Sequence, residues 1–197
     1  MNIDTEHLHH WMCAIRESNN PMRTLDAFWQ GQMKSKEWLI DELSKHITGP
    51  VTIDIHCGWV GTLASMLFQS GLDIGCIQSI DIDPLCQHVA INMNKMEHFS
   101  GKFRAIVKDI CDFHSYADII INTSCEHISQ EEYDTWLSNL PIERLIVLQS
   151  TNYPIDEHRR NANSLDEFVE QSKIKNILFK GELELIKYNR YMIIGTT

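Results

Sequence analysis

The sequence predicts an α/β fold of three layers, with a mostly parallel seven-stranded sheet, an antiparallel C-terminal hairpin and helices that precede the first strand. Three observations predict it. Apolar runs of strand length alternate with segments of helical period along the chain. Several of these runs are apolar without alternation, which is typical of parallel strands buried on both faces. The segment 51–62, which reads VTIDIHCGWVGT, turns from a strand through glycines into a helix.

Two helices are expected before the first strand. Apolar residues recur at helical spacing in 5–15 and 35–47, and Asn19-Asn20-Pro21 between them indicates a turn. After the glycine turn, a crossover helix is expected over 62–69, where Gly71 stops it. The strand before the glycine turn and this crossover helix therefore begin a strand–helix–strand unit.

The later elements follow the same alternation. Pro84 favours a helix start, and Ser129 with Glu132 forms a capping box at another. The expected strands are 76–82, 102–107, 118–122, 144–149, 174–179, 182–186 and 191–194, and the expected helices are 84–98, one from Ser129, and 165–171. Residues 1–197 are thus predicted to form one domain, with a helical N-terminal cap (1–48) and an α/β core (49–197).

The charge balance disfavours nucleic acid as a partner. The chain has 17 Lys and Arg against 27 Asp and Glu, a formal net charge of −10, which would repel a polyanion. No apolar run approaches the roughly 18 residues that a membrane span needs, and no secretory leader is recognisable. We therefore expect a cytoplasmic protein with no membrane partner, and the oligomeric state is left open.

The cysteines predict neither disulfides nor a metal site. They form no CxxC pair, and a structural zinc site needs four ligands with close local pairing. Reduced thiols and no bound metal are expected. The six are Cys13, Cys57, Cys76, Cys86, Cys111 and Cys125.

Polar residues stand at the ends of four successive predicted strands. They are Asp54, Asp81, Asp109 and Asn122. Because the carboxyl ends of parallel strands line one crevice, we expect these side chains to converge on a ligand. The 27 residues from Asp54 to Asp81 suit one strand–helix–strand unit with the second carboxylate near ribose hydroxyls.

The order and spacing of these signals resemble the class I S-adenosylmethionine-dependent methyltransferases, which have a Rossmann-like fold, over residues 48–197. The resemblance implies S-adenosyl-L-methionine as cofactor, with the methionine part beside the first turn, the ribose at Asp81 and the adenine at Asp109 and Ile110. The residues implied to bind the cofactor are Asp54, His56, Cys57, Gly58, Trp59, Gly61, Asp81, Ile82, Asp109, Ile110 and Asn122. The turn reads D-x-H-x-G-x-V-G, so His56 and Val60 stand where the family usually has glycine.

The polar run after the fourth core strand, NTSCEH, supplies the candidates for chemistry. Methyl transfer needs alignment and sometimes a base, and Glu126 and His127, with Asn122 at the start of the loop, are the candidates for acceptor binding or proton removal. The alternative is that this loop only caps a helix and faces solvent. The expected substrate-binding residues are Thr123, Ser124, Gln149, Asn152 and Tyr153, with His158 and Arg159 near in sequence. The segment 28–38 is either a lid or packing.

The leading prediction is a methyltransferase for a polar small molecule with an N, O or S acceptor. A non-catalytic S-adenosylmethionine- or nucleotide-binding module is the alternative that His56 and Val60 suggest. A nucleotide-dependent oxidoreductase is less favoured, because the GxGxxG fingerprint is missing. A nucleic-acid methyltransferase is disfavoured by charge.

Overall fold

The computed structural model describes residues 5–197 and confirms the predicted seven-stranded sheet, whose order is β3-β2-β1-β4-β5-β7-β6. The first five strands are parallel, and β7 runs antiparallel to both β5 and β6. The strands are β1 (Val51–His56), β2 (Ile74–Asp81), β3 (Phe103–Val107), β4 (Ile119–Asn122), β5 (Leu145–Thr151), β6 (Asn176–Glu184) and β7 (Asn189–Thr196). The first four residues of the expected N-terminal cap lie outside the described range.

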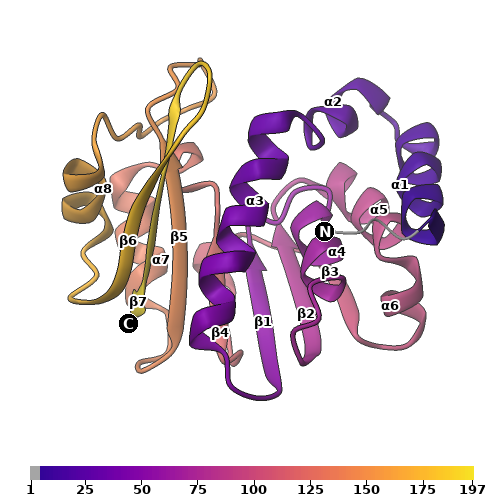
Figure 1. Ribbon diagram of the computed structural model, residues 1–197, viewed down its shortest axis with the longest axis horizontal. Coiled ribbons are helices and arrows are strands. Elements are labelled where there is room, and N and C mark those ends of the chain that lie inside the picture. The colour runs from indigo at the N-terminus through magenta and orange to yellow at the C-terminus, as the bar shows by residue number, and fades with distance from the viewer. Residues whose placement is uncertain (1–4) are drawn as a thin grey trace.

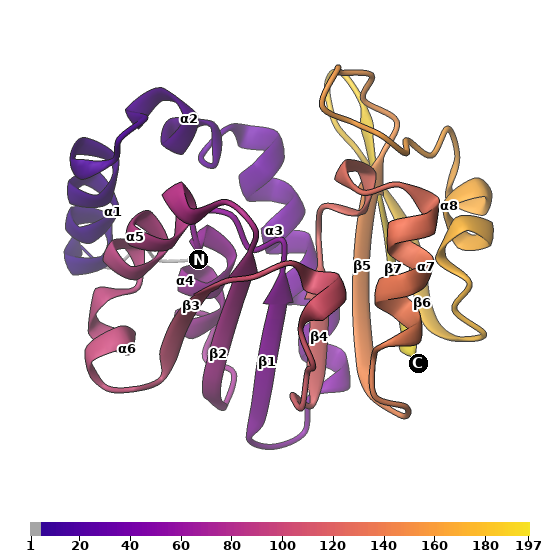
Figure 2. The same cartoon turned by 180° about the vertical axis from the view of Figure 1, so that it is seen from behind.

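Helices cover both faces of this sheet. They are α1 (Thr5–Glu17), α2 (Pro21–Asp26), α3 (Gln30–Leu43), α4 (Thr62–Phe68), α5 (Pro84–Met93), α6 (Lys95–Phe99), α7 (Gln130–Ser138) and α8 (Leu165–Ser172). Short 3₁₀ turns are η1 (Ser44–His46), η2 (Ile110–Asp112) and η3 (Cys125–His127). One apolar core packs α1, α3, α4 and α5 on the sheet, and a second packs α7 and α8 on the opposite face (Figures 1 and 2).

The N-terminal region contains a helix, α2, where the Asn19-Asn20-Pro21 segment predicts only a turn. Asn20 caps it by accepting a hydrogen bond from the Arg23 N–H at 3.1 Å, and Pro21 occupies the first turn. The same Asn-Pro signal that ends one helix therefore starts the next. In both ribbon views α2 bridges α1 and α3 above the carboxyl ends of the strands (Figure 2).

The C-terminal hairpin has two long strands, so the prediction of separate strands at 174–179 and 182–186 is wrong. Gly181, which stands between the two expected strands, lies within β6. A Cβ there would lie 2.6 Å from the Phe179 ring and 3.1 Å from Trp38, so the glycine makes room for these aromatics. The hairpin turn then projects past the sheet beside the start of α3 (Figure 1).

Among residues 5–197, none of the helices combines the length and apolar character that a membrane crossing requires.

Candidate functional site

A cavity of about 1260 Å³ lies at the carboxyl ends of the parallel strands. Its wall comes from the β1–α4 loop, the ends of β2 and β4, the loop after β5, the start of α3 and the β6–β7 turn. A Cβ on Gly31 would lie 2.3 Å from the Tyr188 hydroxyl, so α3 and the hairpin turn meet closely over this space. The cavity exceeds the roughly 300–1,000 Å³ usual for one small ligand.

The β1–α4 loop has an unusual backbone. Cys57, Trp59 and Gly61 all adopt positive φ, of 54°, 50° and 77°. For non-glycine residues this conformation costs energy, and such strain concentrates at ligand sites. Gly58 is required for packing, because a Cβ there would lie 2.0 Å from the Ser79 Oγ. The loop is thus held in a strained conformation against the end of β2.

Asp81, at the end of β2, ties this loop to the next one. Its Oδ2 accepts the Trp59 N–H at 2.8 Å, and its Oδ1 accepts the Asp83 N–H at 3.0 Å. Asp83 caps α5 and pairs with Arg23 of α2 at 2.5 Å, and the guanidinium lowers the pKa of that carboxyl. The N-terminal helices are therefore anchored beside Asp81.

The end of β3 contributes Asp109, which lies exposed at the cavity. Its Oδ1 accepts the Cys111 N–H at 2.8 Å and caps η2, and Ile110 is buried next to it. The Ile82 side chain, 67% exposed, also lines the cavity. A carboxylate with flanking apolar side chains suits a flat heterocycle with an amino group.

Asp54 lies outside the cavity lining, unlike the position expected for a cofactor contact. It is 1% exposed and accepts hydrogen bonds from Ser115 Oγ at 2.6 Å and Gln78 Nε2 at 3.2 Å. Burial raises the pKa of its carboxyl, while these two bonds oppose the shift. Asp54 therefore fastens β1 to β2 and to the loop before β4.

His56 and Asn122 also lie outside the lining. His56 is fully buried, its Nδ1 accepts the Trp136 indole N–H at 2.6 Å, and burial lowers its pKa to about 3. Asn122 is fully buried too, and its Oδ1 accepts the Ser124 N–H at 2.9 Å. Because both strands are covered on both faces, these polar side chains are held inside the protein as neutral groups.

Three more expected site residues are absent from the lining. Gly61 packs against α5, where a Cβ would lie 2.8 Å from the Asn94 amide. Gln149 is buried and donates to the Ser35 carbonyl at 3.1 Å. Asn152 accepts the Asn189 N–H at 2.8 Å, which fixes the loop after β5 to β7. The other expected positions, Cys57, Gly58, Trp59, Asp81, Ile82, Asp109, Ile110, Thr123, Ser124, Glu126, His127 and Tyr153, all line the cavity.

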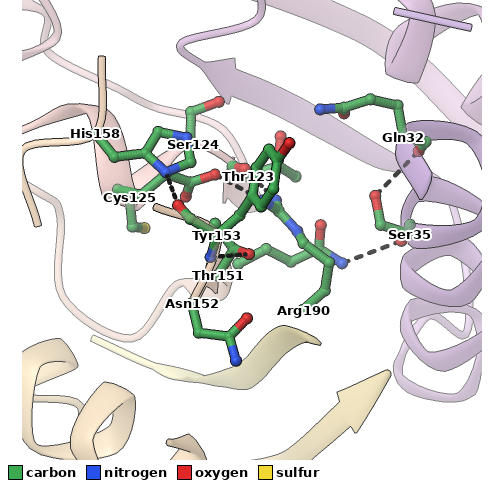
Figure 3. A network of polar contacts seen from close by, with 12 residues as sticks. Gln32, Ser35, Thr123, Ser124, Cys125, Thr151, Asn152, Tyr153, His158 and Arg190 are labelled. Carbon is green, nitrogen blue, oxygen red and sulfur yellow. Dashed lines mark hydrogen bonds and ion pairs between the residues drawn. The ribbon is translucent and has the colours of Figure 1, made fainter. Parts of the chain in front are cut away.

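Glu126 forms a buried ion pair at the cavity. Its Oε1 accepts from Arg190 Nη1 at 2.6 Å, with both side chains no more than 6% exposed. Arg190 also donates to the Thr123 carbonyl at 2.6 Å (Figure 3). Lys36 of α3 lies nearby, and burial lowers the pKa of its amine to about 7, with Arg190 lowering it further and Glu126 opposing this. The Glu126 carboxylate therefore lies near two basic side chains, Arg190 and Lys36.

Two histidines stand beside Glu126. The rings of His127 and His158 pack edge to face with centroids 4.8 Å apart. His158 Nδ1 lies 2.7 Å from the Tyr153 carbonyl, in the contact drawn in Figure 3. Partial desolvation lowers the pKa of His127, while Glu126 opposes this shift. The loop after β4 and the loop after β5 thus place two imidazoles and a carboxylate at one point.

Sequence reasoning missed Arg190 and Tyr188 as cavity residues. The β5–β7 register pairs Arg190 with Thr151, and Tyr188 lies in the hairpin turn. A basic residue at the start of an otherwise apolar strand was the available signal for Arg190.

Known proteins match this chain in structure but not in sequence. No protein-family model matches the chain, and no curated protein matches it by sequence. The structure is similar to magnesium protoporphyrin IX methyltransferase (ChlM) from Synechocystis PCC 6803 with bound S-adenosylhomocysteine, at a TM-score of 0.68 and 12% identity over 98% of this chain and 94% of that one.

Two other solved methyltransferases show the same likeness. N-methyltransferase NodS from Bradyrhizobium japonicum WM9, in complex with S-adenosylhomocysteine, has a TM-score of 0.64 and 13% identity over 95% of this chain and 98% of its own. Geranyl diphosphate methyltransferase, in complex with GPP and sinefungin, has a TM-score of 0.62 and 12% identity over 84% of this chain and 78% of its own. The chain therefore has the Rossmann-like fold of the class I methyltransferases.

Proposed function

We propose that this protein is an S-adenosylmethionine-dependent methyltransferase for a polar small molecule. The observation that carries the proposal is the cavity that brings the strained β1–α4 loop, Asp81 and Asp109 together at the carboxyl ends of three adjacent strands. In open parallel sheets, nucleotide-type ligands bind at this edge. Similar solved structures with bound S-adenosylhomocysteine support the same cofactor here.

Each part of the cofactor has a candidate partner. The Asp81 carboxylate would accept from the ribose hydroxyls, since it is already oriented by the Trp59 and Asp83 N–H groups. Asp109 would accept from the adenine amine, with Ile82 and Ile110 against the ring. The backbone of Cys57 and Gly58 would lie along the methionine part.

The opposite wall of the cavity would hold the methyl acceptor. Thr123, Ser124 and Tyr153 offer hydroxyl groups there. Bound S-adenosylmethionine would supply a methyl group to the acceptor N, O or S and leave as S-adenosylhomocysteine, and a base beside the acceptor would take the acceptor's proton. Glu126 and His127 are the candidates for that base, and the protein's main contribution is alignment in a shielded site.

Calorimetric titration with S-adenosylmethionine and S-adenosylhomocysteine tests the proposal. Wild type should bind both, and Asp81→Asn should weaken binding by about 1.5–3 kcal/mol, roughly 10- to 150-fold, because a charged acceptor is lost. Asp73→Asn, at an exposed position outside the cavity lining, is the matched control and should bind as wild type does. Absence of wild-type binding at millimolar ligand would overturn the proposal.

Turnover is tested separately with methyl-labelled cofactor and a panel of polar metabolites. Label on an acceptor supports the methyltransferase assignment. Cofactor binding without transfer to any of a broad panel would favour the non-catalytic binding module. A change in NADH fluorescence when the protein is added would favour the oxidoreductase. Tight RNA or DNA binding at physiological salt would favour a nucleic-acid methyltransferase.

A further inference from the structure

Glu126, His127 and His158 form a three-residue cluster of metal-ligand type. Each offers one ligand atom, and these atoms all lie within 4.8 Å of one another. The spacing of potential ligands in the sequence predicts no metal site, because close local ligand pairs are lacking. The third ligand comes from another loop, 31 residues after His127. We propose that these three side chains bind a divalent transition-metal ion.

The Glu126 carboxylate gives an independent indication of a missing partner. Arg190 occupies its Oε1, but its Oε2 is buried and has no hydrogen-bond partner among residues 5–197. The side chain is 4% exposed, so water does not readily supply the second contact. A buried carboxylate oxygen without a partner is costly. A cation at the cluster would satisfy it.

The hydrogen bond of His158 prepares its ring for a metal. A backbone carbonyl only accepts, so the Tyr153 oxygen at 2.7 Å requires the proton on His158 Nδ1. The Nε2 of that ring is then left with a free lone pair. Metal-binding histidines almost always donate their other ring N–H to such a group. The guanidinium of Arg190 similarly orients the Glu126 carboxylate.

The cluster needs only a small closure around an ion. Metal–ligand bonds of about 2.0–2.1 Å in tetrahedral geometry place ligand atoms about 3.4 Å apart, so the widest separation here must shrink by roughly 1.4 Å. The His127 side chain is exposed, and its ring hydrogen-bonds the Glu157 backbone. Arg190 and Lys36 oppose a cation electrostatically, and Glu157 at the cavity favours it. The charge of Glu132 is balanced by Arg159, which pairs with it at 2.6 Å.

Two imidazoles and one carboxylate select borderline ions such as Zn²⁺, Fe²⁺ or Co²⁺ over Mg²⁺ or Ca²⁺. Three protein ligands leave coordination positions open, as in catalytic rather than structural sites. Because the cluster lines the cavity, an oxygen or nitrogen of a molecule bound there would complete the coordination. That role in orienting the acceptor rests on the proposed function, whereas binding of the ion does not.

Titration of chelator-stripped protein with Co²⁺, followed by its visible d–d absorption, tests the proposal. Wild type should develop the bands with one equivalent, and Zn²⁺ should displace them. His158→Gln removes a proposed ligand. It should therefore weaken Co²⁺ binding at least about tenfold, the smallest loss usual when an outer-shell partner of a metal site is mutated. His114→Gln, at an exposed histidine outside the cavity, is the matched control and should leave binding unchanged. Circular dichroism checks that each variant is folded.

Glu126→Gln provides a second variant and should also weaken Co²⁺ binding at least about tenfold. Three results would overturn the proposal: no absorption with wild type, wild-type affinity in folded His158→Gln, or loss of the bands in His9→Gln. The last result would locate the ion at His9 and Cys13, where the His9 Nε2 and the Cys13 Sγ lie 3.6 Å apart. Titration of the metal-free protein with S-adenosylmethionine reports separately on the proposed function.

Discussion

Replacement of Lys36 by methionine tests the electrostatics of the cavity wall. The Lys36 side chain is 7% exposed, and its amine donates to the Gln32 side chain at 2.9 Å. Burial, with Arg190 nearby, lowers the pKa of this amine from 10.5 to about 7. Methionine has a similar length and no charge, so Lys36→Met removes the proton-binding group while it keeps most of the volume.

The sign of the effect follows from proton binding. Between pH 7 and pH 10.5 the unfolded chain holds a proton on Lys36 that the folded protein has released, so this residue makes stability rise with pH. Below about pH 7 both states are protonated, and the burial cost is fully present. Between pH 6 and pH 9, the two pKa values give a change of about 2–3 kcal/mol in the free energy of unfolding.

Urea unfolding of both proteins at pH 6 and pH 9 measures this change. The stability of Lys36→Met relative to wild type should be more favourable at pH 6 than at pH 9 by about 2–3 kcal/mol. Titrating groups that do not interact with Lys36 contribute equally in the two proteins and cancel. Lys34→Met, at an exposed lysine of α3, should show no such difference between the two pH values. A pH-independent stability difference for Lys36→Met would show that the pKa of the Lys36 amine is not lowered in the folded protein.

Two substitutions test the packing under the cavity. Gly58→Ala places a Cβ 2.0 Å from the Ser79 Oγ and should cost about 1–3 kcal/mol in urea unfolding, whereas Gly49→Ala meets no atom within 4 Å and should cost little; equal costs would contradict the packing argument. Trp136→Phe removes the 2.6 Å hydrogen bond to His56 and should lower the free energy of unfolding by about 1–3 kcal/mol. A variant as stable as wild type would contradict this prediction.

The position of the cavity followed from local sequence signals. Each strand end could be recognised from an apolar run that stops at a polar residue, and parallel strands bring such ends to one edge. Asp81 and Asp109 line the cavity for this reason. Their roles toward a cofactor stay predictions.

The sequence did not reveal which strand-end polar groups would be buried. Asp54 and His56 point to the same face of β1, beneath α7 and the loop before β4, where Ser115 and Trp136 supply their hydrogen bonds. Those partners lie 61 and 80 residues away in the chain. A rule based on sequence position alone therefore predicts these side chains in the site, whereas the structure buries them outside the cavity lining.

Long-range pairing also explains the residues that were missed. Arg190 reaches Glu126 because the antiparallel register sets it opposite Thr151. His158 reaches His127 because the loop after β5 folds back on the loop after β4. Local period and propensity carry no information on either register, so the charged and imidazole cluster becomes visible only in three dimensions.

A crystal structure with S-adenosylhomocysteine is the most direct test of the proposed cofactor site. We expect ligand density in the cavity, with the ribose hydroxyls at hydrogen-bond distance from Asp81, the adenine amine at Asp109 and the sulfur directed toward the wall that contains Glu126. Density elsewhere, or the nucleoside in an orientation that leaves both carboxylates without ligand contact, would contradict it.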